Sequence, residues 1–200
     1  QYVQNDLDTK FELLRMNAEH FAYDLGKSVI IKPKASIWII FMPIFFVFYA
    51  QKLQKYKKDI QDFARGYQFT KTLALGAARE EKITGEPAEI FFADPPKEVG
   101  TPEIWEVVRA VQREEVDILR RHYLKLMDRE GETHADLVRA AYTTAGAYRS
   151  FLNRLHKAEE AVNEAVLTHL QTTPEARATT KAIEKRAEEM RLREMDTIFS

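Results

Sequence analysis

A run of sixteen residues without a charge, ASIWIIFMPIFFVFYA, occupies positions 35–50 and constrains the fold more than any other part of the sequence. Elsewhere charged residues are frequent, and they make up 30% of the 200 positions. A helix that is apolar on every face has to be buried on every face, either in a large protein core or in lipid. A chain of this length builds only a modest core, so the run is interpreted as a membrane segment.

The residues at the two ends of the run agree with this interpretation. Trp38 and Tyr49 lie near opposite ends, where aromatic rings favour the bilayer interface. The expected membrane anchor consists of Ile37, Trp38, Phe41, Pro43, Phe45, Phe48 and Tyr49. The basic residues that follow the run are candidates for binding anionic lipid head groups: Lys52, Lys55, Lys57 and Lys58. The alternative is that they are the ordinary cationic flank of a membrane segment.

The run is compatible with two topologies. Sixteen residues of straight helix reach about 24 Å, which is short of a hydrocarbon core of about 30 Å. Pro43 also removes a backbone donor near the middle of the run. Lysines on both flanks favour a re-entrant segment, whereas continuity with the next helix favours a crossing. We predict the re-entrant form, with the bulk of the chain facing the cytoplasm, and keep the spanning helix as the alternative.

Apolar residues recur at helical spacing on both sides of the run. Over residues 6–25 they predict an amphipathic helix that ends at Gly26. Over residues 51–83 they predict one continuous helix with a regular heptad seam, which is typical of a face that packs on another helix. The residues expected to form a bundle or partner seam are Leu53, Ile60, Phe63 and Tyr67.

The second half of the chain contains a linker and three helix starts. Glycines and prolines in residues 84–100 predict a linker, whose apolar Ile90–Phe92 is expected to dock on the rest of the protein. Threonines followed by proline or acidic residues predict helices that begin at Thr101, Thr133 and Thr173. The helix after Thr133 is expected to continue for about 38 residues and to form an antiparallel hairpin with the helix before it.

These patterns together predict an all-α fold, namely a membrane-anchored helical bundle with a long antiparallel helical hairpin and coiled-coil-like heptad seams. The expected parts are an amphipathic helix and membrane approach (1–34), the membrane segment (35–50), a heptad stalk (51–83), a linker (84–100), the hairpin (101–171) and a charged C-terminal helix (172–200).

Few residues in the sequence suggest catalytic or metal chemistry. The absence of cysteine excludes disulfides and thiolate chemistry, and no Glu-x-x-His motif is present. Glu115 and His122 lie two turns apart on the packing side of the 101–131 helix, where His156 or Glu159 of the next helix could join them. They could form a polar or metal-binding core, or a buried pair that fixes helix register. No cofactor or metal site is predicted.

The function predicted from the sequence is non-enzymatic. We expect a membrane-anchored scaffold or accessory subunit that holds a protein partner or associates with itself. A net charge of −1 argues against nucleic acid as a partner. The alternatives are a helical-bundle enzyme or metal or cofactor binder that uses Glu115, His122 and His156, and a homo-oligomeric membrane pore.

Overall fold

The computed structural model describes residues 2–30, 56–92, 101–169 and 173–200, and these residues form seven α-helices and no strand. The all-α prediction is therefore confirmed for this part of the chain. The helices are α1 (Tyr2–Val29), α3 (Tyr56–Tyr67), α4 (Phe69–Thr84), α5 (Pro102–Met127), α6 (His134–Tyr142), α7 (Ala145–His169) and α8 (Pro174–Phe199).

The predicted membrane segment lies outside the described residues. None of the helices within the described ranges is long and apolar enough to cross a bilayer. The following predicted residues lie outside these ranges: Ile37, Trp38, Phe41, Pro43, Phe45, Phe48, Tyr49, Lys52, Leu53 and Lys55. Lys57 and Lys58 belong to the first turn of α3, where Lys58 is half-buried.

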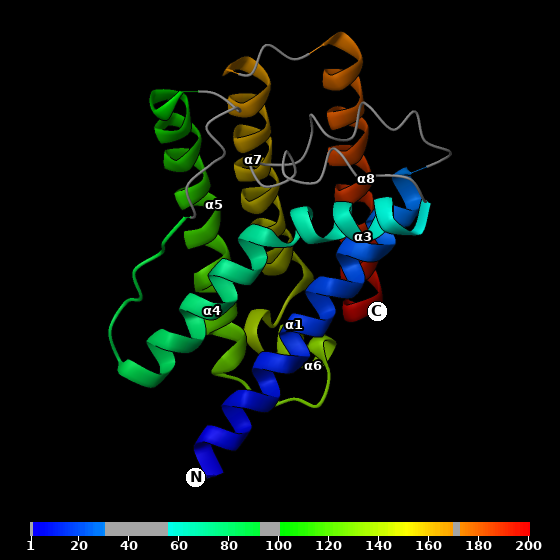
Figure 1. Cartoon of the computed structure of the whole chain (residues 1–200). Helices are drawn as coiled ribbons and strands as arrows, with labels where there is room; N and C mark the ends of the chain where they lie inside the picture. Colours follow the sequence, from blue (N-terminus) through cyan, green and yellow to red (C-terminus); the bar gives the residue numbers. More distant parts are fainter. Residues whose placement is uncertain (1, 31–55, 93–100, 170–172) are drawn as a thin grey trace.

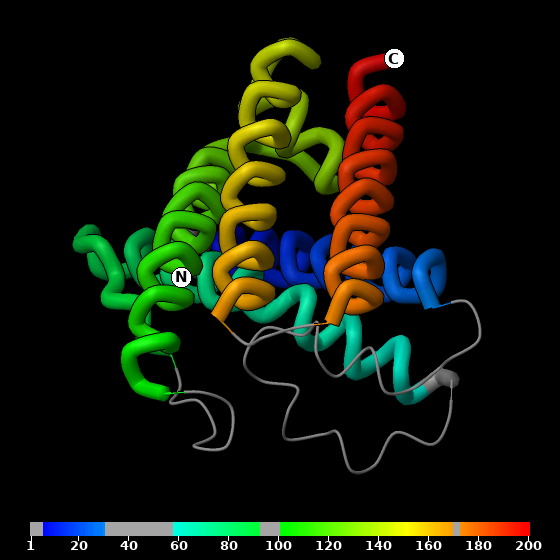
Figure 2. The backbone as a smooth tube through the Cα atoms, turned by 90° about the horizontal axis from the view of Figure 1, so that it is seen from above, coloured from blue at the N-terminus to red at the C-terminus, as the bar shows by residue number. Residues whose placement is uncertain are grey.

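The helices form two crossed layers. In one layer α5, α7 and α8 lie side by side in alternating directions, and the other layer contains α1 and the α3–α4 pair (Figures 1 and 2). The short α6 connects α5 to α7. Side chains from both layers fill the main apolar core, including Leu14, Leu75, Leu126, Leu137, Phe151 and Met195.

The three helix starts expected from threonine are confirmed. Thr133 and Asp136 form a reciprocal capping box, in which the Thr133 hydroxyl accepts from the Asp136 N–H at 3.2 Å and an Asp136 carboxylate oxygen accepts from the Thr133 N–H at 3.1 Å. The Thr173 hydroxyl accepts from the N–H of Ala176 at 3.2 Å. Thr101 is the extended residue before Pro102, the first residue of α5.

The prediction of one long helix after Thr133 is wrong, because the chain forms α6 and α7 instead. Thr143 adopts a left-handed conformation with φ of 59° and ends α6. The hydroxyl of Thr144 then accepts from the N–H of Ala147 at 3.2 Å and caps the start of α7. The break places the rings of Tyr142 and Tyr148 against each other in the core, with their centroids 5.0 Å apart.

The continuous helix expected over residues 51–83 is also divided in the described part, because α3 ends at Tyr67 and α4 begins at Phe69. Backbone hydrogen bonds continue through Gln68, which accepts from Thr72 and donates to Ala64. The chain bends there, so that α3 follows α1 whereas α4 packs on α5 (Figure 1). A straight seam along both helices is therefore not maintained.

The prediction that the first helix ends at Gly26 is wrong. Gly26 lies inside α1, where it allows α1 and α3 to approach closely. The helix continues to Val29, and the N–H of Ile30 still donates to the Gly26 carbonyl at 2.9 Å. A Cβ atom at residue 26 would lie 3.0 Å from Phe63 and 3.3 Å from Ile60. A glycine is therefore required at this position by the close contact with α3.

Two segments that lacked an obvious partner in the sequence pack on the bundle. Ile90 and Phe92 contact the main core as expected, whereas Phe91 between them is 72% exposed. The charged helix α8 also packs on the bundle, because its residues Ala187 and Ile198 are buried against the other helices.

The contact at Gly26 predicts opposite effects of substituting two helical glycines. Gly76 lies in α4 with no atom within 4 Å of an added Cβ, so Gly76→Ala should stabilise the protein by about 0.5–1 kcal/mol through helix propensity. Gly26→Leu should destabilise it by about 1–3 kcal/mol, because the side chain overpacks the contact with α3. Urea denaturation of both variants measures the difference. Equal stabilisation by the two substitutions would contradict the α1–α3 contact.

Candidate functional site

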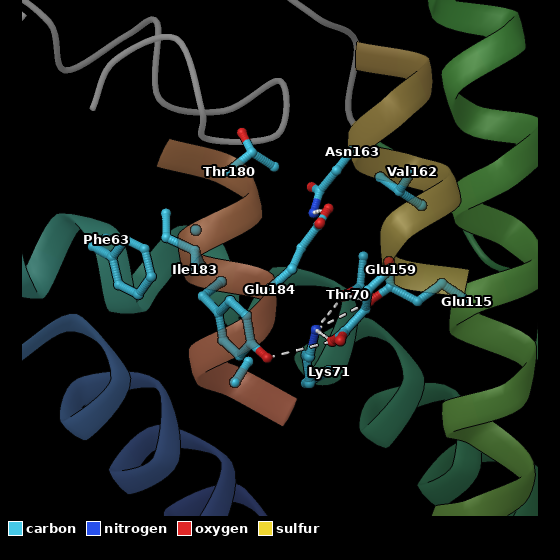
Figure 3. A pocket seen from close by; sticks show the side chains of 13 residues that line it. Phe63, Thr70, Lys71, Glu115, Glu159, Val162, Asn163, Thr180, Ile183 and Glu184 are labelled. Carbon is cyan, nitrogen blue, oxygen red and sulfur yellow. Dashed lines mark hydrogen bonds and ion pairs between the residues drawn. The ribbon is translucent and has the colours of Figure 1, made fainter. Parts of the chain in front are cut away.

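A network of buried charges lies where the two helix layers cross. Lys71 of α4 places its ammonium 3.1 Å from a carboxylate oxygen of Glu115 of α5 and 2.6 Å from one of Glu159 of α7. Arg191 of α8 donates to both oxygens of Glu159, at 2.6 and 2.7 Å. Figure 3 shows Lys71 pointing between the two glutamates. The network therefore joins four helices through two cations and two carboxylates.

Neutral polar groups complete the network. The hydroxyl of Thr70 donates to Glu115 at 2.6 Å. The hydroxyl of Tyr67 accepts from Arg191 at 2.7 Å, and the Lys71 ammonium lies 4.3 Å from the centre of the Tyr67 ring. Buried charges are tolerated in proteins when they are paired and hydrogen-bonded in this way.

The pairing outweighs burial in setting the ionisation of these groups. Burial opposes a charge on Glu159, but Arg191 and Lys71 lower the pKa of this carboxyl to about 2. Burial likewise opposes a charge on Lys71, yet the two glutamates raise the pKa of its ammonium. Burial raises the pKa of the Tyr67 phenol to about 12. Glu159 and Lys71 therefore stay ionised, and the Tyr67 phenol stays neutral, around neutral pH.

Two small cavities adjoin the network, and Tyr67 and Lys71 line both of them. Each has a volume of about 70 Å³, which accommodates about two water molecules at about 30 Å³ each. One cavity extends between α7 and α8 (Figure 3), where Asn163 donates to Glu184 at 3.0 Å. The other is lined by aromatic residues, which include Phe21, His122, Tyr123, Tyr148 and Phe151.

His122 is separate from Glu115, contrary to the hypothesis that they share a site. Its ring stacks on Phe151 with the centroids 4.0 Å apart, and its Nδ1 shares a hydrogen bond of 2.7 Å with the Tyr142 hydroxyl. Burial, together with His134 and Lys125, keeps the pKa of His122 well below its usual value. His122 is therefore a neutral part of an aromatic core.

His156 lies in a third environment. Its Nε2 is 3.7 Å from a Glu160 carboxylate and 3.9 Å from that of Glu188. Among the described residues no group of three or more His, Asp or Glu side chains is arranged to hold a metal ion. The residues considered for a shared core site, Glu115, His122 and His156, are thus not brought together.

Lys71 and Arg191, the two cations of the network, were not predicted from the sequence. Lys71 follows Tyr67 by four positions, and Arg191 follows Ala187 by four, so helical spacing does place both on inward faces. Lysine and arginine are usually exposed, so neither residue was expected to be buried in spite of its position on an inward face. The combination of an inward lysine or arginine with inward glutamates on other helices is the pattern that could have revealed the network.

Two of the predicted seam residues are buried within the protein itself. Ile60 and Phe63 pack with Leu25, Ile30 and Ala187 in a second apolar cluster.

Comparison of the chain with family models, with curated proteins and with solved structures finds no match.

The central position of Glu159 predicts a pH-dependent loss of stability. Glu159→Gln should destabilise the protein by about 3–5 kcal/mol at pH 7, because Arg191 and Lys71 lose a buried partner. The folded pKa of about 2 lies below the ordinary 4.5, so the carboxylate's contribution is present above about pH 4.5 and is lost as the pH falls towards 2. The difference between wild type and variant should shrink over that range in urea denaturation.

The matched control is Glu164→Gln on the same helix. Glu164 pairs with Arg177 on the surface, at 2.7 Å, and its removal should change stability little at any pH. Similar behaviour of the two variants would show that Glu159 has no special role.

Proposed function

We propose that this chain is a non-enzymatic helical scaffold that docks on a membrane through residues 35–50. The run enters one leaflet and returns, and the bundle stays on the cytoplasmic side, where it holds a protein partner or a second copy. The observation that carries the proposal is the contact between the end of α1 and the start of α3, the two helices that flank the run.

This contact constrains how the intervening residues can meet a bilayer. Ile30 is the last described residue before the run, and it is buried in the same cluster as Ile60 of α3. Gly26, one turn before the end of α1, also lies close to α3, since a Cβ atom there would be 3.3 Å from Ile60. A single crossing would separate them by a hydrocarbon layer of about 30 Å. The contact therefore supports a re-entrant segment over a spanning helix.

The composition of the run supports docking on a membrane. It contains four phenylalanines and four isoleucines, and burying each such side chain is worth about 1.5–3 kcal/mol. Lys52, Lys55, Lys57 and Lys58 would add attraction to anionic lipids, at about 1 kcal/mol for each residue near the surface.

The interior of the bundle favours a scaffold over a cofactor binder. Binding sites for small molecules usually have volumes of about 300–1,000 Å³, whereas the two cavities beside the charge network hold about 70 Å³ each. The network itself is internally paired. An interior whose buried charges are paired with one another suits a protein whose task is to present its surfaces.

The proposed topology predicts where single cysteines will be labelled. Asp24 of α1 and Gln61 of α3 are exposed and flank the run, and the chain has no native cysteine. In sealed vesicles, Asp24→Cys and Gln61→Cys should both react with a membrane-impermeant maleimide that is added to one side, and to the same side. Vesicles opened with detergent provide the control for full reactivity. Labelling from opposite sides would establish a spanning helix and refute the re-entrant model.

The proposed anchor predicts a selective loss of membrane binding. Phe41→Asp combined with Phe45→Asp should release the protein from vesicles, because two charges would have to enter the hydrocarbon. Wild type should stay bound in a flotation assay after a high-salt or carbonate wash, since hydrocarbon burial is not screened by salt.

The control introduces the same charges at exposed apolar residues of the bundle. Ile83 and Phe91 are 48% and 72% exposed, so Ile83→Asp with Phe91→Asp should leave vesicle binding intact. A wild-type protein that washes off freely would refute the anchor.

A further inference from the structure

Among the described residues, one face of α1 is not covered by the other helices. Glu12, Met16, His20, Tyr23 and Lys27 are exposed and recur at intervals of three or four residues, so they form a single stripe along the helix. Met16 is 48% exposed and Tyr23 is 40% exposed, which is high for large apolar side chains at the middle of a packed helix. We call this set of five residues the α1 stripe.

A groove of about 340 Å³ lies beside the α1 stripe, between α1 and α8. Phe21 and Met190 are its half-buried apolar residues. Its polar residues are Asn17, His20, Asp24, Arg193 and Glu194. His20 belongs to both the stripe and the groove, so an element that packs on the stripe would also cover the groove.

The order of residues in the stripe favours one kind of partner. Glu12 and Met16 are four residues apart, and so are Tyr23 and Lys27. When two copies of the helix pack antiparallel, one register places Glu12 opposite Lys27 of the second copy and Met16 opposite Tyr23 of the second copy. Parallel pairing would instead place Glu12 opposite Glu12 and Lys27 opposite Lys27. The charges are therefore complementary only in the antiparallel arrangement.

We propose that the chain forms a symmetric dimer in which the α1 stripes of two copies pack antiparallel. The two-fold axis passes between Glu19 and His20, and every contact occurs twice, as in other isologous interfaces. Met16, Tyr23 and the groove supply the buried apolar surface, whereas the end charges fix direction and register. The dimer does not depend on the proposed membrane docking, because all of the stripe lies in described residues of α1.

Two contacts within one copy are compatible with this interface. Glu12 already accepts from Arg15 at 2.8 and 3.0 Å, and a carboxylate can accept from a second cation as well. The Lys27 ammonium lies 5.3 Å from the centre of the Tyr23 ring, so it can reach Glu12 of the second copy by turning a solvent-exposed side chain.

Crosslinking of single-cysteine variants tests the direction of packing. In the antiparallel dimer the two copies of residue 20 are adjacent, whereas the two copies of residue 12 lie about 22 Å apart along the helices. A short bis-maleimide should therefore crosslink His20→Cys into a dimer and leave Glu12→Cys monomeric. The full chain in detergent micelles, without native cysteine, is the starting material. Equal crosslinking of both variants, or of neither, overturns the proposal.

Charge reversal tests the register. Glu12→Lys and Lys27→Glu should each weaken the dimer by about tenfold in sedimentation equilibrium, because each creates two like-charge contacts. The double variant should restore wild-type affinity. Lys157→Glu, an exposed reversal on α7, should leave the affinity unchanged. Single reversals without effect, or a double variant that does not recover, exclude the proposed register, and unchanged thermal midpoints verify that the variants are folded.

Discussion

The ionic contacts of Glu159 with Arg191 and Lys71 are the interaction on which the arrangement of the helices depends. They connect α7 to α8 within one layer and to α4 of the other. A buried ion pair adds little net stability compared with well-packed apolar residues, but removal of one partner is costly. We therefore expect the network to act mainly by excluding other packings: any shift of one layer over the other would leave a charge buried and unpaired.

The bend at Gln68 follows from the same constraint. Tyr67 at the end of α3 and Thr70 and Lys71 at the start of α4 all have to reach the network. A straight helix would carry α3 away from α1, where Gly26 accommodates Phe63. The bend satisfies both demands, because α3 stays on α1 while α4 turns towards α5. The α1–α3 contact and the charge network thus determine the shape of this segment together.

Local features of the fold could be read from the sequence, and features that depend on contacts between helices could not. The caps at Thr133 and Thr173 involve neighbours three residues away, so the sequence alone predicts them. The sequence predicts a helix end at Gly26, whereas the structure shows that the glycine accommodates the side chain of Phe63 from α3. Glu115 and His122 share one face of α5 but lie two turns, about 10 Å, apart, and each meets a different neighbour. Spacing along one helix predicts which side chains point inward but not which partners they find there.

The proposed dimer and the proposed membrane docking restrict each other geometrically. In the antiparallel pair the C-terminal ends of the two α1 helices would lie about 28 Å apart, on opposite sides of the two-fold axis. Each end is followed, after residues 30–34, by its own apolar run. Both runs can enter one leaflet only when the two-fold axis is perpendicular to the bilayer and the α1 helices lie along its surface. A dimer in that orientation would have two anchors and would bind the bilayer more tightly than a single chain, since the second run meets the bilayer at a high effective concentration once the first has bound.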